Sequence, residues 1–249
     1  MSSTGRIIGL LRSVAIYHAI PLRQQRLRRF YAQFVSPGDL VFDLGAHAGN
    51  RTRAFVAIGC RVVAVEPQPD FARLLRILFA RSPEVEVIEA AVGREPGYTS
   101  LVISDRTPTV STIAAPWREA RAREPDFSSV HWNRRIDVEM TTLDVLIERL
   151  GMPAFVKIDV EGAEPNVLAG LSRPVRSLSF EYLPRALDYA RACAMRLGAL
   201  GRYQFNWSRS ESYRLAMERW ITGTELSTAL EAADAQSRPG DVYARLDAS

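Results

Sequence analysis

Lysine is almost absent from this sequence. Lys157 is the only lysine among 249 residues, and every other residue of the lysine and arginine total is an arginine. One group of arginines stands close together at residues 23–29, while the others are scattered along the chain. Scattered arginines indicate a solvated surface. The net charge of +4 and the pI near 9.3 therefore do not point to a nucleic-acid-binding tract.

Cysteine is scarce as well. The two cysteines, Cys60 and Cys193, form no spacing with the three histidines that would suggest a zinc site. We expect both to be free thiols, which favours a reducing compartment, and the cytoplasm is the expected location. The sequence shows no signal peptide and no apolar run long enough to span a membrane. Its 47% hydrophobic content is sufficient for one large globular domain.

Short apolar runs alternate with helix-like segments in the first third of the chain. Runs at 40–44, 61–65 and 85–89 suit buried parallel strands, and helices are expected at 51–58 and 70–81, the second N-capped by Asp70. This alternation predicts a doubly wound parallel sheet with helices on both faces, a Rossmann-like α/β fold. Further strands are expected at 154–160, 177–183, 202–207 and 241–246, with helices at 142–150, 184–197 and 225–235.

Two regions fall outside this pattern. Residues 1–35 read as a helical extension that Pro21 interrupts, expected either to dock on the main domain or to form a homo-oligomer contact. Residues 36–249 form the main domain. Within it, residues 93–153 are expected to be an insertion over the carboxyl edge of the sheet, with strands at 98–103 and 136–140. Its Trp117 and Trp132 are expected to serve in packing or as a lid.

The turn after the first strand suits a ligand. It runs from Asp43 to Asn50, with an acid at the strand end and glycines at Gly45 and Gly49. Glycine allows the backbone to approach a ligand closely, and the start of the following helix offers free amides to a carboxylate or phosphate.

The next strand ends in a second acid. Glu66, followed by Pro67, stands where a carboxylate can accept hydrogen bonds from both ribose hydroxyls of an adenosine-type ligand. A dinucleotide is disfavoured, because His47 occupies the position where a glycine clears the pyrophosphate. A dehydrogenase is therefore a weaker alternative.

A third cluster of charges follows the strand at 154–160. Asp159 and Glu161 are delivered to the same edge of the sheet, and charges beside a buried strand need partners. Asp159 suits an ammonium group or a metal, and Lys157 is either a partner of these acids or reaches solvent. With Glu181 the acids fall short of a convincing metal site, so no metal is predicted.

These residues together resemble the FkbM family of methyltransferases. The resemblance covers about residues 39–183, through the runs 43–50, 65–67, 90–93, 142–144 and 157–162 and through Glu181. The ending at 240–245 is also similar to the family. It implies a class I methyltransferase sheet of seven strands, the last antiparallel. It further implies S-adenosylmethionine as methyl donor and a hydroxyl acceptor on a small molecule, sugar, glycan or natural product.

The resemblance also implies roles for individual residues. Cofactor contacts are expected from Asp43, Gly45, His47, Gly49, Asn50, Glu66, Pro67, Ala90, Ala91 and Asp159. Among them, Asp43 and the two glycines would line the methionyl arm, Ala90 and Ala91 would border the adenine, and Asp159 would meet the methionyl amine. His47 departs from the family, since many relatives have asparagine there.

A hydroxyl acceptor needs a base to remove its proton. Glu161, His47 and Glu181 are the candidates, with His131 in the insertion as a weaker one. Two alternatives stay open. One is a nucleic-acid methyltransferase, although no target-base motif occurs, and the other is a non-catalytic cofactor-binding module of the same fold.

Overall fold

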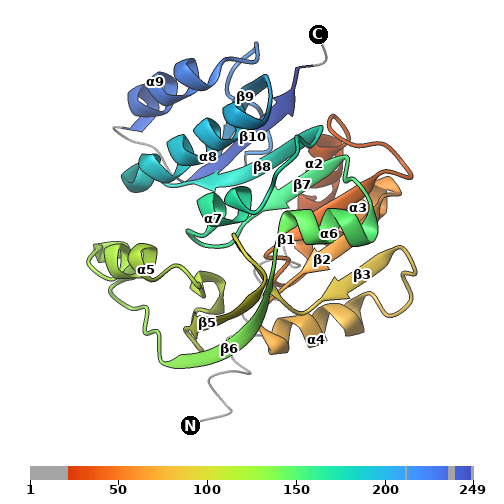
Figure 1. Ribbon diagram of the computed structural model, residues 1–249, viewed down its shortest axis with the longest axis vertical. Coiled ribbons are helices and arrows are strands. Elements are labelled where there is room, and N and C mark those ends of the chain that lie inside the picture. The colour runs from red at the N-terminus through yellow and green to blue at the C-terminus, as the bar shows by residue number, and fades with distance from the viewer. Residues whose placement is uncertain (1–21, 211, 235–238, 248–249) are drawn as a thin grey trace.

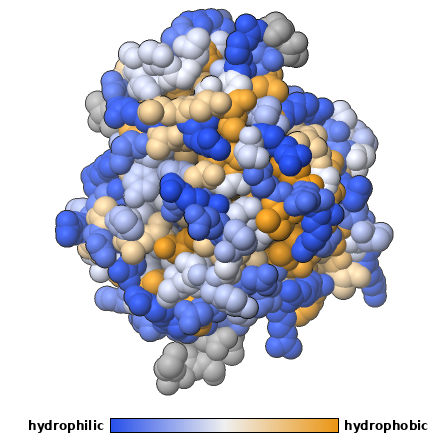
Figure 2. Space-filling view, in the orientation of Figure 1, coloured by the Kyte–Doolittle hydropathy of each residue, from blue (hydrophilic) through white to orange (hydrophobic). Residues whose placement is uncertain are grey.

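The computed structural model describes residues 22–210, 212–234 and 239–247 (Figure 1). The first part of the predicted helical extension, residues 1–21, lies outside the described residues. In the described part, no helix is both long and apolar enough to cross a membrane. On the face seen in Figure 2, hydrophilic residues are interspersed with smaller hydrophobic areas.

A seven-stranded sheet forms the centre of the molecule. Its strands, in spatial order, are β3 (Val85–Ile88), β2 (Arg61–Val65), β1 (Leu40–Leu44), β7 (Phe155–Ile158), β8 (Ser177–Tyr182), β10 (Gly240–Leu246) and β9 (Tyr203–Arg209). β10 runs antiparallel to both of its neighbours, and the other pairs in the sheet are parallel. This confirms the predicted Rossmann-like class I arrangement, including the antiparallel last strand.

The register of the central strands fixes the edge at which the site lies. Leu44 pairs with Val65 on one side and with Ile158 on the other, so that β1, β2 and β7 end at the same level. The residues that follow these strands therefore meet at the carboxyl edge, the usual ligand position in open α/β sheets.

Side chains alternate between the two faces of the sheet, and each face is covered by helices. One face presents Val41 and Phe155 and is covered by α2 (Arg23–Tyr31) and α3 (Asn50–Ile58), while α4 (Pro69–Leu78) packs beside Ala64 on β2. The other face presents Val156 and Ile158. It packs against α6 (Leu143–Leu150), α7 (Glu164–Ala169) and α8 (Leu187–Leu200), with α9 (Gly223–Asp234) beside α8 and β9.

The helix α2 docks on the domain through aromatic side chains. Phe30 and Tyr31 are buried, with the Phe30 ring centred 5.1 Å from that of Tyr243 and the Tyr31 ring 4.5 Å from that of Phe55. Burying such rings contributes about 1.5–3 kcal/mol each. The described part of the extension therefore docks on the main domain, and a homo-oligomer contact through the extension stays a prediction.

The insertion forms a small second sheet and a roof. The strands β4 (Ala91–Val92), β6 (Arg134–Thr141) and β5 (Gly97–Ile103) pair in that order. Between β5 and β6 lie the short helix α5 (Ala115–Arg121) and the 3-10 turns η1 (Pro108–Val110) and η2 (Pro125–Phe127). Trp117 is buried, and Trp132 donates a hydrogen bond from Nε1 to the Val110 oxygen at 3.0 Å. Both tryptophans therefore pack, as expected.

Several predicted boundaries were wrong. Helix α4 begins at Pro69 with Gln68 at its N-cap position, so Asp70 lies in the first turn and is not the cap. Strand β7 ends at Ile158 because the chain turns sharply afterwards. The predicted helix 184–197 is a 3-10 turn, η3 (Pro184–Ala186), followed by α8. Helices α5 and α7 were not predicted, since each is only a few residues long.

Glu164 shapes the turn after β7. Its Oε1 accepts hydrogen bonds from the backbone nitrogens of Val160 at 3.1 Å and Gly162 at 3.3 Å. Glu161, which lies between the two donors, and Gly162, which is one of them, have left-handed φ angles of 53° and 90°. Burial raises the pKa of Glu164 to about 7. The turn is therefore held by an acid that resists ionisation.

Glu164→Gln should change how stability depends on pH. The folded-state pKa of Glu164 lies above its unfolded value, so its contribution is present below pH 4.5 and is lost as pH rises through about 7. The glutamine keeps the Oε1 acceptor but cannot ionise. We expect similar stability of both proteins at pH 4.5, and at pH 8 a gain for the variant of up to about 3 kcal/mol. Urea unfolding at both pH values measures the free energy of unfolding. An equal change in this free energy between pH 4.5 and pH 8 for the variant and the wild type would contradict the prediction.

Candidate active site

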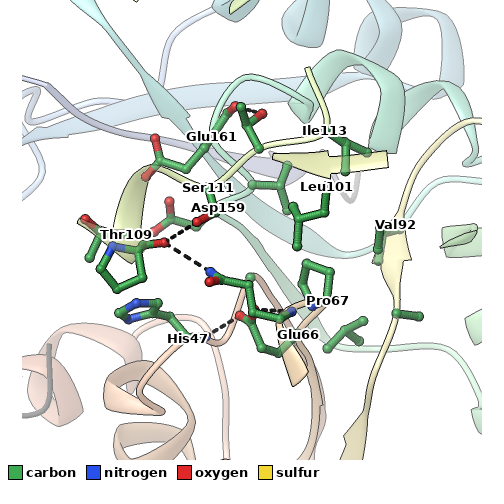
Figure 3. Close-up of a pocket in the computed structure, with 18 residues that line it drawn as sticks. His47, Glu66, Pro67, Val92, Leu101, Thr109, Ser111, Ile113, Asp159 and Glu161 are labelled. Carbon is green, nitrogen blue, oxygen red and sulfur yellow. Dashed lines mark hydrogen bonds between the residues drawn. The ribbon is translucent and has the colours of Figure 1, made fainter. Parts of the chain in front are cut away.

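A cavity opens at the carboxyl edge between the ends of β1, β2 and β7 and the roof of the insertion (Figure 3). About 680 Å³ of space lies within this first cavity, part of it open to solvent. Its lining comes from the turn after β1, the end of β2, the strands β4 and β5, residues 108–113 of the roof, and residues 159–161. Segments far apart in sequence thus form one site.

Gly45 allows the tight turn after β1. Its φ is +77°, and a Cβ atom there would lie 1.8 Å from the backbone oxygen of Asp159. The backbone nitrogens of Gly45 and Ala46 both donate to the Val65 oxygen, at 2.9 and 3.1 Å. No residue with a side chain fits, so glycine is required for the first strand end to touch the other two.

Glu66 lies at the floor of the first cavity and is only 3% exposed. One carboxylate oxygen accepts from the His47 nitrogen at 2.8 Å and the other from the Gln68 nitrogen at 2.9 Å. Burial raises the pKa of Glu66 to about 7, and these hydrogen bonds oppose that rise. Because each carboxylate oxygen accepts about two hydrogen bonds, both retain capacity for ligand hydroxyls.

The other end of the first cavity is apolar. In Figure 3, Val92, Leu101 and Ile113 lie together there. Ala90 and Ala91, predicted to border an adenine, line the same cavity beside them. The roof is tied down by Gln68, whose Nε2 donates to the Pro108 oxygen at 3.0 Å. This end suits the face of a flat aromatic ring.

Two predicted cofactor contacts lie beneath the turn instead. Asp43 is 1% exposed, and its Oδ2 accepts from the Thr52 hydroxyl at 2.6 Å. Gly49 has a φ of +75°, and a Cβ atom there would meet Leu75 and Phe79 at 2.8 Å. Neither residue lines the cavities described here, so both shape the turn, and their contact with a cofactor stays a prediction.

His47 lines the cavity in a strained conformation, with a φ of +46°. Its ring lies 3.9 Å, centre to centre, from that of Phe71. Burial lowers the pKa of His47 to about 3, so the imidazole is neutral at physiological pH. A group with so low a pKa is a weak proton acceptor, which makes His47 the poorest of the three base candidates.

Three carboxyl groups converge beside the first cavity. Asp159, Glu161 and Glu181 each offer an oxygen within 4.8 Å of those of the others. They line a second cavity of about 1010 Å³, which also reaches Asn50 and Asp241. The two cavities meet at a wall that includes Asp159 and Glu161, since both residues line both cavities.

Glu161 and Glu181 ionise at a higher pH than glutamates ordinarily do. Burial raises the pKa of each well above its usual range, and neighbouring carboxylates raise it further: Asp159 and Glu164 for Glu161, and first of all Glu161 for Glu181. Two carboxyl groups this close favour sharing a proton, because ionisation of one disfavours ionisation of the other. The pair therefore keeps a proton to higher pH than an isolated glutamate does.

The backbone of Glu161 is held from both sides. The Thr112 hydroxyl of the roof donates to the Glu161 oxygen at 2.6 Å, and the Glu164 bonds hold the residues on either side. Trp117 lies against Gly162, where a Cβ atom would come within 2.1 Å of the indole. The insertion thus fixes the position of the candidate base.

The acids could also hold a divalent cation, since oxygen ligands suit magnesium. However, the ammonium of Lys157 lies 3.2 Å from Asp159 Oδ2 and already compensates part of their charge. That no metal is bound stays a prediction.

Lys157 was expected either to be a partner of the acids or to reach solvent, and the first alternative holds, since it is fully buried and pairs with Asp159 and Asp241. Sequence reasoning missed Asp241, which lies beside Glu181 because β10 pairs with β8, and Gln68, which holds the roof. Thr112, whose hydroxyl was a candidate to face the site, holds Glu161. Only the strand order, which no local pattern carries, would have identified Asp241. His131 is exposed and lines neither of these cavities.

Comparison with known proteins identifies the family. A model of the Methyltransferase FkbM domain matches residues 43–195, more than half of the chain. A comparison with curated proteins gives no significant match. A solved TehB-like SAM-dependent methyltransferase from Corynebacterium glutamicum is 11% identical, with a TM-score of 0.46 over 95% of this chain and 94% of that one.

Two further solved structures are similar at the same low level. The precorrin-6y C5,15-methyltransferase from Geobacter metallireducens is 12% identical, with a TM-score of 0.45 over 91% of this chain and 85% of that one. Fibrillarin from Aeropyrum pernix, with S-adenosylmethionine bound, is 12% identical, with a TM-score of 0.45 over 85% and 68%. The family match, and not these likenesses, carries the assignment.

The first cavity fits the cofactor of this family. Gly45 provides a turn without a side chain, Glu66 retains acceptor capacity for ribose hydroxyls, and the opposite end is apolar. Asp159, with its side chain 37% exposed, offers a carboxylate for an ammonium group. The chain belongs to the FkbM family of methyltransferases, which use S-adenosylmethionine as methyl donor.

Proposed function

We propose that this enzyme methylates a hydroxyl group on a small molecule, a sugar or a related natural product. The observation that carries the proposal is the pair of Glu161 and Glu181 at the edge of the second cavity, beside the first. Acceptor and donor would occupy the second and first cavities, with the reacting atoms meeting at the shared wall.

The first cavity provides for each part of the donor. Glu66 would accept hydrogen bonds from the ribose, Ala90 and Ala91 would border the adenine, and Asp159 would meet the methionyl amine. Gly45 and the start of α3 at Asn50 would lie along the methionyl arm. The bound cofactor supplies an activated methyl group, so the protein must mainly align the acceptor and remove its proton.

The proton would pass to the Glu161–Glu181 pair. A base works best when its pKa lies near the working pH, and burial together with neighbouring carboxylates raises the pKa of both residues in that direction. The donor would supply its methyl group to the acceptor oxygen and leave as S-adenosylhomocysteine when its methyl–sulfur bond breaks, and the O–H proton of the acceptor would move to a carboxylate oxygen of the pair. Of the two glutamates, Glu161 is the more direct proton acceptor, because it lines both cavities.

The same acids disfavour a nucleic-acid acceptor. Asp159, Glu161, Glu181 and Asp241 line the second cavity, and carboxyl groups offer no positive charge to neutralise a phosphate backbone. A neutral polyhydroxylated acceptor can instead donate hydrogen bonds to these carboxylates.

A single measurement tests the reaction class. Purified enzyme is incubated with extracts and donor carrying a ¹³C-methyl group, and the labelled product is found by mass spectrometry. The ¹³C shift of the transferred methyl then distinguishes oxygen from nitrogen or carbon. A product labelled on nitrogen would overturn the proposal, and so would labelled RNA.

Glu66→Ala should weaken binding of S-adenosylhomocysteine by about 1–3 kcal/mol, because charged hydrogen bonds to the ribose are lost. Titration calorimetry measures the change. Glu89→Ala is the matched control, since Glu89 follows the next strand but pairs with Arg76 outside both cavities. Equal affinity of the Glu66 variant and the wild type would mean that the ribose lies elsewhere.

Glu161→Gln should lower kcat by about 10²- to 10⁴-fold, because the amide cannot take up the hydroxyl proton of the methyl acceptor. Donor affinity should change little. The wild-type rate should rise with pH through the raised pKa of the pair.

Initial rates on the identified acceptor, measured across pH, give both effects. His131→Ala, an exposed change outside both cavities, serves as the control with unchanged rate. A Glu161→Gln enzyme with wild-type kcat would exclude this residue as the base.

A further inference from the structure

The single lysine of the chain lies at the centre of the site. The side chain of Lys157 on β7 is fully buried, and its ammonium has three oxygen acceptors. These are Asp241 Oδ1 at 3.0 Å, Asp159 Oδ2 at 3.2 Å and the Ile158 backbone oxygen at 3.3 Å. A buried ammonium is stable only with such partners.

Lys157 connects parts of the site that the sheet keeps apart. Asp159 follows β7, whereas Asp241 lies on β10, and β8 stands between the two strands. Asp159 lines both cavities, and Asp241 lines the second. The hydroxyl of Tyr243 donates to the other oxygen of Asp241 at 3.3 Å, which fixes that carboxylate. One ammonium therefore joins the walls of the two cavities.

Helix α2 helps to keep this connection dry. Phe155, two residues before Lys157 on the same face of β7, packs against Tyr31 and Phe34, with ring centres 5.8 and 5.4 Å apart. Phe34 also stacks on Tyr243 at 5.1 Å. Electrostatic interactions between the groups beneath this layer are stronger than in water, because solvent does not screen them.

The group is charged in spite of its burial. Burial alone would lower the pKa of Lys157, but Asp159 and Asp241 more than offset this and raise the pKa above its ordinary value. One ammonium between two carboxylates leaves the three side chains with one net negative charge. That charge lies at the wall where the methionyl amine of the donor would bind.

Arginine, used everywhere else, would not serve here. The ammonium is compact and presents three donors, which matches the three oxygens around it. A guanidinium is planar, has five donors and needs more room, so that some donors would be left without partners in a buried site. The choice of lysine at this one position follows from the shape of the site.

We propose that Lys157 is a positioning residue, which holds Asp159 at the wall between the cavities and transmits the charge of Asp241 to the donor site. The proposal rests on the placement of the donor amine at Asp159, stated under the proposed function. It does not depend on the acceptor being a hydroxyl.

Asp241→Asn tests the transmission of charge. The variant keeps the shape of the side chain but leaves the ammonium of Lys157 opposite Asp159 alone, so the wall, which Arg51 also lines, loses one negative charge. Asp241 lines the second cavity and not the first, so a change in donor affinity is assigned to Lys157 only if the ¹⁵N resonance of Lys157 described below also responds to the donor. We expect the affinity for S-adenosylhomocysteine to fall about tenfold in calorimetry.

Asp39→Asn is the matched control. Asp39 pairs with Arg176 at 2.9 Å before β1, at the opposite edge of the sheet, so its variant should bind as the wild type does. Melting temperatures of both variants show that they are folded. A folded Asp241→Asn protein with unchanged affinity would overturn the proposal.

A spectroscopic measurement follows Lys157 directly. Protein labelled with ¹⁵N-lysine has one side-chain ammonium nitrogen, because the chain has one lysine. Its ¹⁵N resonance should shift on addition of S-adenosylhomocysteine, because the amine of this ligand would interact with the Asp159 carboxylate that Lys157 contacts. The substitution Asp241→Asn should shift the same resonance in the protein without ligand. A resonance that does not respond to the donor would mean that Lys157 only stabilises the fold.

The failure of this inference is separable from the failure of the donor placement. If Glu66→Ala weakens binding and Asp241→Asn does not, the donor site stands and the role of Lys157 is refuted. If neither variant changes the affinity, the placement of the donor in the first cavity is itself wrong.

Discussion

The site depends on one close backbone contact. The turn after β1 comes so near to the end of β7 that the Cβ of any residue other than glycine at position 45 would collide with the Asp159 oxygen. The same turn is bonded to the end of β2 through the Val65 oxygen. Three strand ends are thereby drawn to one point, and their first polar residues, Glu66 and Asp159 among them, must share the space above it.

Gathering acids in this way has an electrostatic cost that the protein meets unevenly. Lys157 compensates Asp159 and Asp241, and backbone amides compensate Glu66 and Glu164. Burial still raises the pKa of Glu66 and Glu164, and the pKa values of Glu161 and Glu181, which have less compensation, lie well above their ordinary range. A sulfonium donor that also carries an ammonium group adds positive charge at this edge, so its binding relieves part of the repulsion. Negative charge at the edge and a cationic cofactor therefore suit one another.

The sequence was informative where function is encoded close to a strand end. The alternation of apolar runs predicted the order of strands and helices, and the acids at 66, 159, 161 and 181 do line the cavities. The sequence was less informative where the role of a residue depends on the direction in which its side chain points. Asp43 stands at a strand end as well, but the alternation along β1 turns it under the turn towards Thr52.

Long-range pairing was the main limit. Asp241 reaches the site only because β10 inserts between β8 and β9, and Thr112 only because the insertion folds back over Glu161. No pattern within a few residues of either position reports such a contact. The boundaries of α4 and β7 failed for a smaller reason, since caps and strained turns are set by individual hydrogen bonds rather than by hydrophobic periodicity.

Two segments outside the central strands determine how the acids behave. The insertion fixes the Glu161 backbone through Thr112 and Trp117, and α2 covers the face on which Lys157 lies. The strand ends alone would present solvated carboxylates with ordinary acidity. With both segments in place, Glu161 is fixed, and Glu161 and Glu181 are reluctant to ionise. The reactivity of this edge is therefore a property of the covering segments as much as of the sheet, and changes in either segment should alter acidity before they alter the fold.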